Sequence, residues 1–277
     1  MSAFDITPLV AIVVIGVGAV AGALGALLGI GGGVFLVPFL NAVLGLPFNV
    51  ASGVGLMTVI ATSSVVSASG GRRPVNLRLG MLLQIASSAG GLVGGVYVAR
   101  MPPRALYILF ALVTAAIAAI TLSRLDRRNV ILDRAADTGQ FGGRFFEEES
   151  GQEVVYRTRN LPAALAVSLA GGSVSGLLGI GGGILQVPAL NAWCGVPLRV
   201  AAATSGVMIG VTAVASAPIY YSRGDVVPPL AAAAVIGVLG GSRLGFWFGD
   251  RARSKWLKIL LAAVLVGVSS IYVGKSL

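Results

Sequence analysis

The feature that most constrains this chain is an apolar segment that occurs twice. Residues 27–47 read LLGIGGGVFLVPFLNAVLGLP, and residues 177–197, which lie 150 positions later, read LLGIGGGILQVPALNAWCGVP. Residues 22–50 match residues 172–200 at 16 of 29 positions without a gap. A self-match of this length at one fixed offset indicates an internal duplication, so we expect the chain to fold as two related halves.

Apolar runs recur along both halves. With 56% apolar and only 11% charged residues, the 277-residue chain has far more hydrophobic material than a soluble core uses. The runs cover residues 8–29, 34–44, 49–70, 78–98 and 103–123, and then 161–179, 184–194, 199–220, 228–248 and 256–273. The sequence therefore predicts an all-α, polytopic protein of the inner (plasma) membrane.

Two of the runs, residues 34–44 and 184–194, are too short to cross a bilayer. A helix of this length reaches about 16 Å, roughly half of the hydrocarbon thickness. We therefore expect each repeat to contain about four full spans and one half-helix, which gives 8 to 10 membrane segments in total.

Residues 124–160 differ in composition from the rest of the chain, with seven arginines and seven acidic residues. The predicted organisation is a first transmembrane repeat over residues 1–123, a polar cytoplasmic connector over 124–160 and a second transmembrane repeat over 161–277. Two interpretations of the connector remain open. Either it lies against the membrane surface through Phe141, Phe145 and Phe146, or it is a partly disordered loop.

The basic residues predict how the repeats are oriented. If the segments alternate in direction and the connector is cytoplasmic, 15 basic residues lie inside and four lie outside. Two parallel repeats would give a split of about 12 against 7 by the same count. Since cytoplasmic loops carry the excess of Lys and Arg, the sequence favours two inverted repeats.

The glycine motif predicts a break in a membrane helix. Such a break leaves backbone N–H and C=O groups unpaired, which is tolerated only inside protein or beside a wet cavity. The glycines allow the chain to turn, and Pro38 and Pro188, five residues after the last glycine of each motif, suit the first turn or a kink of the half-helix. The start of each half-helix would then offer free N–H donors and the positive end of a helix dipole, which attract an anion. In two inverted copies these ends are expected to converge near the midplane on one small anionic substrate.

The predicted substrate site combines both turns with the polar residues near them. Gln186 replaces the apolar Leu36 of the first copy and Ser205 replaces Gly55, so the second half has more polar side chains. The predicted members are Gly31, Gly32, Gly33, Val34, Asn41, Gly181, Gly182, Gly183, Ile184, Gln186, Asn191, Thr204, Ser205 and Arg243.

Several residues have a structural interpretation beside the functional one. Asn41 and Asn191 suit either ligand contact or hydrogen bonds that hold the half-helices in place. Arg243, inside an apolar run, suits either a counter-charge for the substrate or a side chain that extends to the membrane interface. Glycines three or four apart, such as the pair Gly241 and Gly245, suit close helix packing.

The residue types that are missing exclude several functions. The chain has no histidine and one cysteine, Cys194, so we expect no metal site, no cofactor and no enzymatic activity. Its basic residues stand at the ends of apolar runs, which argues against nucleic acid as a partner. No predicted span contains Asp or Glu away from its ends. A proton, as the candidate coupling ion, is therefore expected to travel with the titration of the substrate itself.

The doubled segment GIGGG-x4-P-x-L-N, followed each time by a Gly-x-Pro turn, resembles the TauE/SafE family of sulfite and organosulfonate exporters, also called the toluene-sulfonate uptake permease type. This resemblance implies a secondary transporter that moves sulfite, sulfoacetate, an organosulfonate or thiosulfate by alternating access. The chain departs from the family pattern where Val54 and Gly55 replace the Thr-Ser pair, which it has only at Thr204 and Ser205. A passive anion channel and a carrier for a non-sulfur organic anion are the alternatives.

Overall fold

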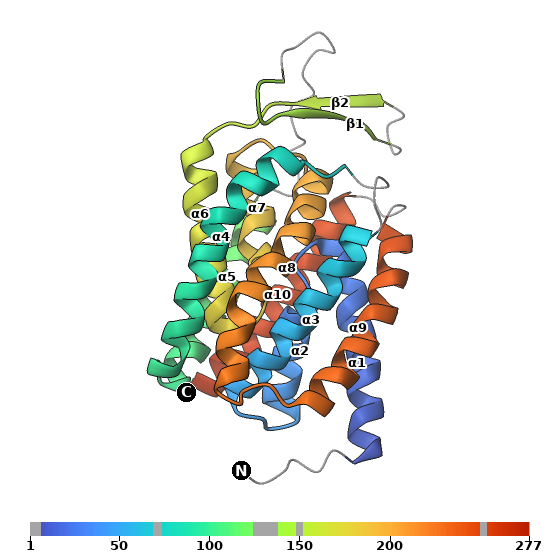
Figure 1. Cartoon of the computed structure of the whole chain (residues 1–277). Helices are drawn as coiled ribbons and strands as arrows, with labels where there is room; N and C mark the ends of the chain where they lie inside the picture. The colour runs from blue at the N-terminus through green and yellow to red at the C-terminus, as the bar shows by residue number, and fades with distance from the viewer. Residues whose placement is uncertain (1–6, 69–73, 124–137, 148–151, 250–253, 277) are drawn as a thin grey trace.

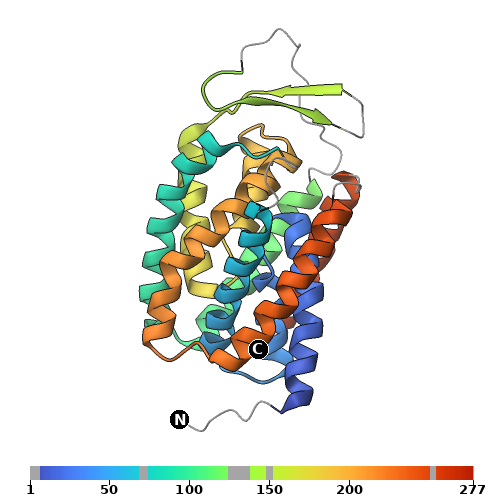
Figure 2. The ribbon, with the colours of Figure 1, turned by 45° about the vertical axis from the view of Figure 1, so that its right-hand side comes forward.

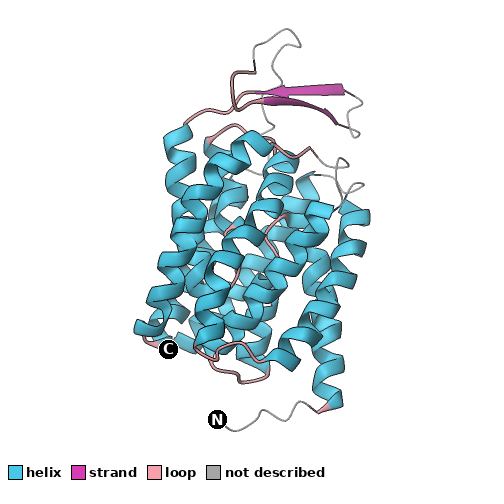
Figure 3. Ribbon diagram, viewed as in Figure 1, coloured by secondary structure: helices cyan, strands magenta, loops and turns pink. Residues whose placement is uncertain are grey.

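The computed structural model describes residues 7–68, 74–123, 138–147, 152–249 and 254–276, which form a helical bundle with a small hairpin at one end (Figures 1 and 3). The first half contains α1 (Pro8–Leu28), α2 (Gly33–Pro38), the π-helix η1 (Phe39–Val43), α3 (Phe48–Ala68), α4 (Leu77–Tyr97), the 3-10 helix η2 (Val98–Arg100) and α5 (Pro103–Ser123). The second half contains α6 (Leu161–Leu178), α7 (Gly183–Trp193), α8 (Leu198–Ser222), α9 (Pro228–Gly249) and α10 (Ser254–Ser276). The predicted helical architecture is confirmed.

Five helical stretches are long and apolar enough to cross a membrane among the residues that the structure describes. They are Pro8–Leu28, Phe48–Ala68, Leu77–Arg100, Leu161–Leu178 and Leu198–Ser222. Shorter apolar stretches cover Gly33–Val43, Pro103–Ala119 and Ala262–Lys275. The other predicted spans are also helices in the structure. Their apolar stretches are shorter, or some of their side chains lie outside the described set.

The first helix of each half ends at the first glycine of the motif. At Gly29 the backbone takes the left-handed conformation with φ of 69°, and at Gly179 φ is 70°. This conformation ends a helix and is strained for any residue with a β-carbon. The same local sequence thus stops both helices at the same place.

Each half-helix begins within one residue of its predicted start. In the second half, α7 remains α-helical through Pro188. In the first half, the helix changes after Pro38 into the π-helix η1, in which the N–H of Leu44 donates to the carbonyl of Phe39 at 3.2 Å. The two copies therefore share a start and differ in their final turns.

The helices pack mainly across the two halves. Helix α1 packs along α9. The pair that corresponds to it at the 150-residue offset, α6 and α4, also packs together. In the centre α3 contacts α8, and at the periphery α5 contacts α10. Each contacting pair maps onto another contacting pair, or onto itself, when the 150-residue offset is applied. The duplication read from the sequence is therefore also present in the packing.

Glycines provide the close approach between these helix pairs. A β-carbon at Gly241 would lie 1.8 Å from the carbonyl oxygen of Ala19, and one at Gly172 would lie 1.9 Å from that of Ser87. A β-carbon at Gly245 would lie 2.1 Å from the carbonyl oxygen of Ala23. The predicted role of Gly241 and Gly245 in packing is confirmed, since a side chain at either position would overlap the backbone of α1.

The hairpin belongs to the connector and was not predicted. Strands β1 (Gly143–Glu147) and β2 (Gln152–Tyr156) pair antiparallel, with Gly143 opposite Tyr156. Phe141 and Phe145 pack partly buried against the hydrophobic core, whereas Phe146 is 65% exposed. The amide of Asn76, at the start of α4, donates to the Phe141 carbonyl at 2.8 Å. This bond attaches the described part of the connector, residues 138–147 and 152–160, to the bundle.

The views place the hairpin at one end of the bundle and the start of α1 and the end of α10 toward the other (Figures 1 and 2). Helix α1 starts at the end away from the hairpin, and α6 starts beside it. Helices α4 and α8 also begin at the hairpin end, while the α4–α5 and α8–α9 turns lie at the opposite end. Four of the 15 basic residues that the alternating arrangement places inside, Arg72, Arg73, Arg251 and Arg253, lie outside the described residues.

Candidate functional site

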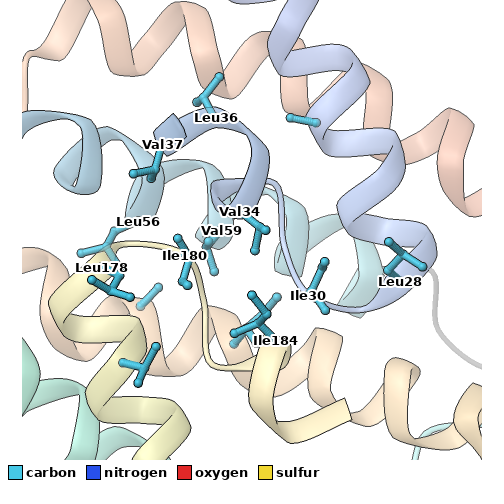
Figure 4. Packing of buried hydrophobic residues seen from close by; sticks show 14 of the residues in the cluster. Leu28, Ile30, Val34, Leu36, Val37, Leu56, Val59, Leu178, Ile180 and Ile184 are labelled. Carbon is cyan, nitrogen blue, oxygen red and sulfur yellow. The ribbon is translucent and has the colours of Figure 1, made fainter. Parts of the chain in front are cut away.

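The two glycine turns lie in direct contact in the middle of the bundle (Figure 4). A β-carbon at Gly33 would lie 2.5 Å from the carbonyl oxygen of Gly179, and one at Gly183 would lie 2.4 Å from that of Gly29. Gly181 approaches the Ile30 carbonyl oxygen in the same sense, at 3.0 Å. The structure therefore brings together the predicted glycines of both halves, and their backbones occupy the space between the half-helix starts.

Apolar side chains surround this contact. Val34 and Ile184, both predicted as site residues, are fully buried in the hydrophobic core. In Figure 4 they lie close to Ile30, Ile180 and Val59. An anion placed between the two turns would meet mainly hydrocarbon, so the polar groups that could hold it must be sought beside the turns.

A cluster of buried polar side chains lies at the start of α7. The Gln186 amide nitrogen donates to Ser87 Oγ at 2.9 Å, and Ser205 Oγ donates to Gln186 Oε1 at 3.2 Å. Ser87 Oγ and Thr212 Oγ1 are 2.8 Å apart, and Gln84 Nε2 donates to Thr212 Oγ1 at 3.1 Å. We call these five residues the polar cluster; they come from α4, α7 and α8.

The polar cluster is neutral and buried. Four of its residues, Ser87, Gln186, Ser205 and Thr212, are at most 1% exposed. It contains amides and hydroxyls only, so it offers hydrogen-bond donors without a carboxylate that would repel an anion. The first turn of α7 adds the positive end of the helix dipole beside Gln186.

Among the described residues, the corresponding place around α2, formed by α2, α3 and α9, has no equivalent cluster. At the positions that correspond to Gln84, Ser87, Gln186 and Ser205, the duplication places Ala234, Gly237, Leu36 and Gly55. Thr62, the counterpart of Thr212, instead accepts a hydrogen bond from the backbone N–H of Gly32 at 3.3 Å. The sequence indicated this asymmetry through Gln186 and Ser205 but missed Gln84 and Ser87. Comparison of α4 with α9 at the repeat offset would have found both residues.

Asn41 and Asn191 brace the far ends of the half-helices. The Asn41 amide donates to the Leu46 carbonyl at 2.8 Å, and the Asn191 amide donates to the Val196 carbonyl at 3.0 Å. Lys275 Nζ also donates to the backbone and side-chain oxygens of Asn41, at 2.7 and 3.1 Å. Each asparagine lies eight residues beyond the last glycine, about 12 Å along the helix, so the structure does not bring it to the turns.

Thr204 and Arg243 point away from the polar cluster. Thr204 Oγ1 accepts a hydrogen bond from the backbone N–H of Asn76 at 2.9 Å, which ties α8 to the start of α4. Arg243 is exposed on α9, a geometry that suits an arginine extending to the interface. Of the predicted polar side chains, the structure therefore gathers Gln186 and Ser205 beside the turns.

Within the described residues, no group of three His, Cys, Asp or Glu side chains could hold a metal ion. The carboxylate closest to full burial is that of Asp225, in the α8–α9 turn, which accepts a hydrogen bond from the Asn49 amide. Burial raises the pKa of Asp225, while the bond from Asn49 and the charge of Arg223 oppose this shift.

The raised pKa of Asp225 predicts how stability depends on pH. A carboxyl whose pKa is higher in the folded than in the unfolded state holds its proton more tightly in the folded state. Its contribution to the free energy of unfolding therefore decreases as pH rises from the usual pKa through the raised value. Asp225→Asn, which keeps an oxygen to accept the Asn49 bond, should therefore gain thermal stability relative to the wild type as the pH is raised across that window. The measurement is the denaturation midpoint of both proteins in one detergent from about pH 4 to pH 8. A stability difference that does not change with pH would contradict the prediction.

A bundle of apolar membrane-length helices, interrupted at its centre and carrying a buried polar cluster beside the interruption, defines a multi-pass membrane protein of the transporter class. The chain belongs to the sulfite exporter TauE/SafE family, which it matches over residues 14–272. This is a family of transporters, not of enzymes.

Two named relatives support the assignment. The chain is 27% identical over 273 residues to the "Probable membrane transporter protein YunE" of Bacillus subtilis (strain 168), an alignment that covers 95% of this chain and 98% of the relative. It is 25% identical over 275 residues to the "Probable membrane transporter protein MJ0441" of Methanocaldococcus jannaschii, with 92% of each chain covered. No solved structure matches the chain.

Proposed function

We propose that this protein is a secondary transporter of the inner membrane that moves small sulfur-containing anions such as sulfite, sulfoacetate, an organosulfonate or thiosulfate. The observation that carries the proposal is the polar cluster at the start of α7: buried, uncharged and rich in hydrogen-bond donors. The sulfur chemistry is an extension of the family's description to this chain.

The anion is held at the start of α7 by Gln186, Ser87 and Ser205. These side chains donate to one another in the described conformation, at 2.9 and 3.2 Å, and reorient toward an oxyanion when it enters. The helix dipole of the eleven-residue α7 adds a favourable interaction with negative charge. Neutral hydrogen-bond donors around a desolvated anion select for the arrangement of the anion's oxygen atoms. A donor inside the protein that is left without an acceptor costs free energy.

Movement of one repeat against the other gives alternating access. The opposite directions of α1 and α6 relative to the hairpin support an inverted arrangement of the repeats (Figure 1). The contacts of Gly33 with Gly179 and of Gly183 with Gly29 are made between the halves, so a rocking motion opens the space between the turns. With no carboxylate in the cluster, a coupled proton is carried on the anion itself.

Gln186→Leu tests the site, because it gives the second half the residue that the first half has at Leu36. Loss of the amide removes one donor to the anion and should weaken anion binding about 10-fold or more, since a hydrogen bond to a charged group contributes roughly 1.5–3 kcal/mol. The measurement is the ligand-induced rise in thermal stability of purified protein with sulfite, thiosulfate, sulfoacetate and carboxylate analogues. Ser64→Ala is the control, since the Ser64 hydroxyl is exposed and donates to the Ile60 and Ala61 carbonyls of its own helix.

Unchanged anion binding by Gln186→Leu would remove this residue from the site. A response to carboxylates but not to sulfur anions would favour a carrier for a non-sulfur organic anion. Reconstituted protein should also show saturable counterflow in vesicles. Single-channel currents in planar bilayers without counterflow would overturn the carrier mechanism in favour of a passive anion channel.

A further inference from the structure

Two buried polar atoms, one within the polar cluster and one on the neighbouring helix α6, have no hydrogen-bond partner in the described part of the chain. They are the side-chain carbonyl oxygen of Gln84, on α4, and the hydroxyl of Ser168, on α6. Ser168 is 1% exposed. An unpaired polar group inside a protein costs about 1–3 kcal/mol, so each of these groups requires an explanation.

The packing of α4 against α6 places these two groups at the same level. Gly172 meets the backbone of Ser87, and Gly176, one turn later, meets that of Gly91, so the two helices run in the same direction. One turn earlier on α6 is Ser168, and the corresponding turn of α4 carries Gln84. Gln84 and Ser168 therefore belong to facing turns of α4 and α6, one turn before the contact of Gly172 with Ser87, which accepts the bond from Gln186.

The order of hydrogen bonds in the cluster fixes which atom of Gln84 is unpaired. The Met208 carbonyl can only accept, so Thr212 donates its one proton there, at 3.2 Å. In this arrangement Thr212 Oγ1 accepts from its other neighbours, and the Gln84 NH2 group donates to Thr212 Oγ1 at 3.1 Å and to Ser88 Oγ at 2.7 Å. The carbonyl oxygen of Gln84 is left as an acceptor that lacks a donor.

Neither group is needed to build the fold. At the 150-residue offset, Ala234 corresponds to Gln84 and Gly18 corresponds to Ser168, and the equivalent helix pair, α1 and α9, packs without these polar groups. A buried acceptor and a buried hydroxyl that the architecture does not require are best explained by a ligand that pairs with both.

We propose that Gln84 and Ser168 recognise a hydrogen-bond donor on the transported anion, so that the ligand is an oxyanion that carries its own O–H group, such as hydrogensulfite or a hydroxyalkanesulfonate. The inference rests on the proposed function and narrows its substrate class. The Gln84 carbonyl accepts from the ligand's O–H, Ser168 donates to one of its oxygens, and the α7 side of the cluster binds the remaining oxygens. An anion that offers only acceptors leaves the Gln84 carbonyl unpaired.

Two probes of equal charge test this specificity on the full-length protein in detergent: 2-hydroxyethanesulfonate, which has a hydroxyl donor, and ethanesulfonate, which does not. Titration calorimetry should show about 10-fold tighter binding of the hydroxylated probe, a factor that corresponds to about 1.4 kcal/mol. Gln84→Met should reduce the preference for the hydroxylated probe to near unity, whatever its effect on the affinity for ethanesulfonate. Ser168→Ala should reduce the preference in part, and Ser64→Ala should preserve it.

Equal binding of the two probes by the wild type, or a preference that survives Gln84→Met in a folded protein, would overturn the inference and leave the proposed function intact. If neither probe binds, sulfite decides the outcome. Affinity for sulfite that falls as pH converts hydrogensulfite to sulfite supports the inference, and affinity that rises contradicts it. Failure of every sulfur anion to bind contradicts the proposed function itself.

Discussion

Gly179→Ala is expected to destabilise the protein by roughly 2–5 kcal/mol, the combined effect of left-handed strain and a backbone overlap. The φ of Gly179 is 70°, and a β-carbon there would lie 2.3 Å from the carbonyl oxygen of Ser52 on α3. Neither the new β-carbon nor the Ser52 carbonyl oxygen belongs to a flexible side chain. The overlap can therefore be removed only by a shift of α3 or of the turn itself. Because this turn also contacts Gly33, the shift would propagate to the centre of the bundle.

Gly45→Ala is the matched control for this prediction. Gly45 has nearly the same backbone conformation, with φ of 68°, but a β-carbon there would meet nothing within 4 Å. It should therefore show only the conformational part of the effect, about 1–2 kcal/mol. Thermal denaturation of both variants in the same detergent measures the difference. Equal losses would mean that contact with α3 does not constrain the turn.

Gly241→Ala should give the second large effect, a loss of about 1–3 kcal/mol from overpacking of α9 against α1. The new methyl group would lie 1.8 Å from the carbonyl oxygen of Ala19, so the two helices would have to separate along their contact. Its neighbour Gly240 offers a control one residue away, since a β-carbon there would meet nothing within 4 Å. Gly240→Ala should change stability by no more than about 0.5 kcal/mol.

The readout for this pair is the thermal midpoint together with the fraction of protein that remains monodisperse after heating. A loss of stability in Gly240→Ala as large as that in Gly241→Ala would show that the segment resists any added methyl group. It would then exclude the specific contact between α1 and α9 as the cause.

Local features of the fold were predictable because their causes are local. The glycine run ends a helix through backbone conformation, and the length of the apolar run that follows sets the half-helix, so the starts at Gly33 and Gly183 follow from the sequence. The hairpin was not predicted. Its strands lie in the charged stretch 143–156, where packing of Phe145 against Tyr156 supports pairing that composition does not indicate.

The candidate site was only partly predictable, because two of its five residues come from α4, a helix distant in sequence. Gln186 and Ser205 stood out as polar departures from the first copy. Ser87 joins them through the packing of α4 on α8, and that arrangement is absent from the local sequence. Asn41 had two interpretations, and its bonds to Leu46 and Lys275 give it the bracing role in the described conformation.

The pairing of α1 with α9 has a consequence for how the molecule is made. Gly241 is synthesised 222 residues after Ala19, the residue that it contacts. A ribosome that adds about 5–20 residues per second needs roughly 10–40 seconds to cover that distance. During this interval the face of α1 that packs on α9 lacks this partner, so the α1–α9 contact forms only after α9 has been synthesised.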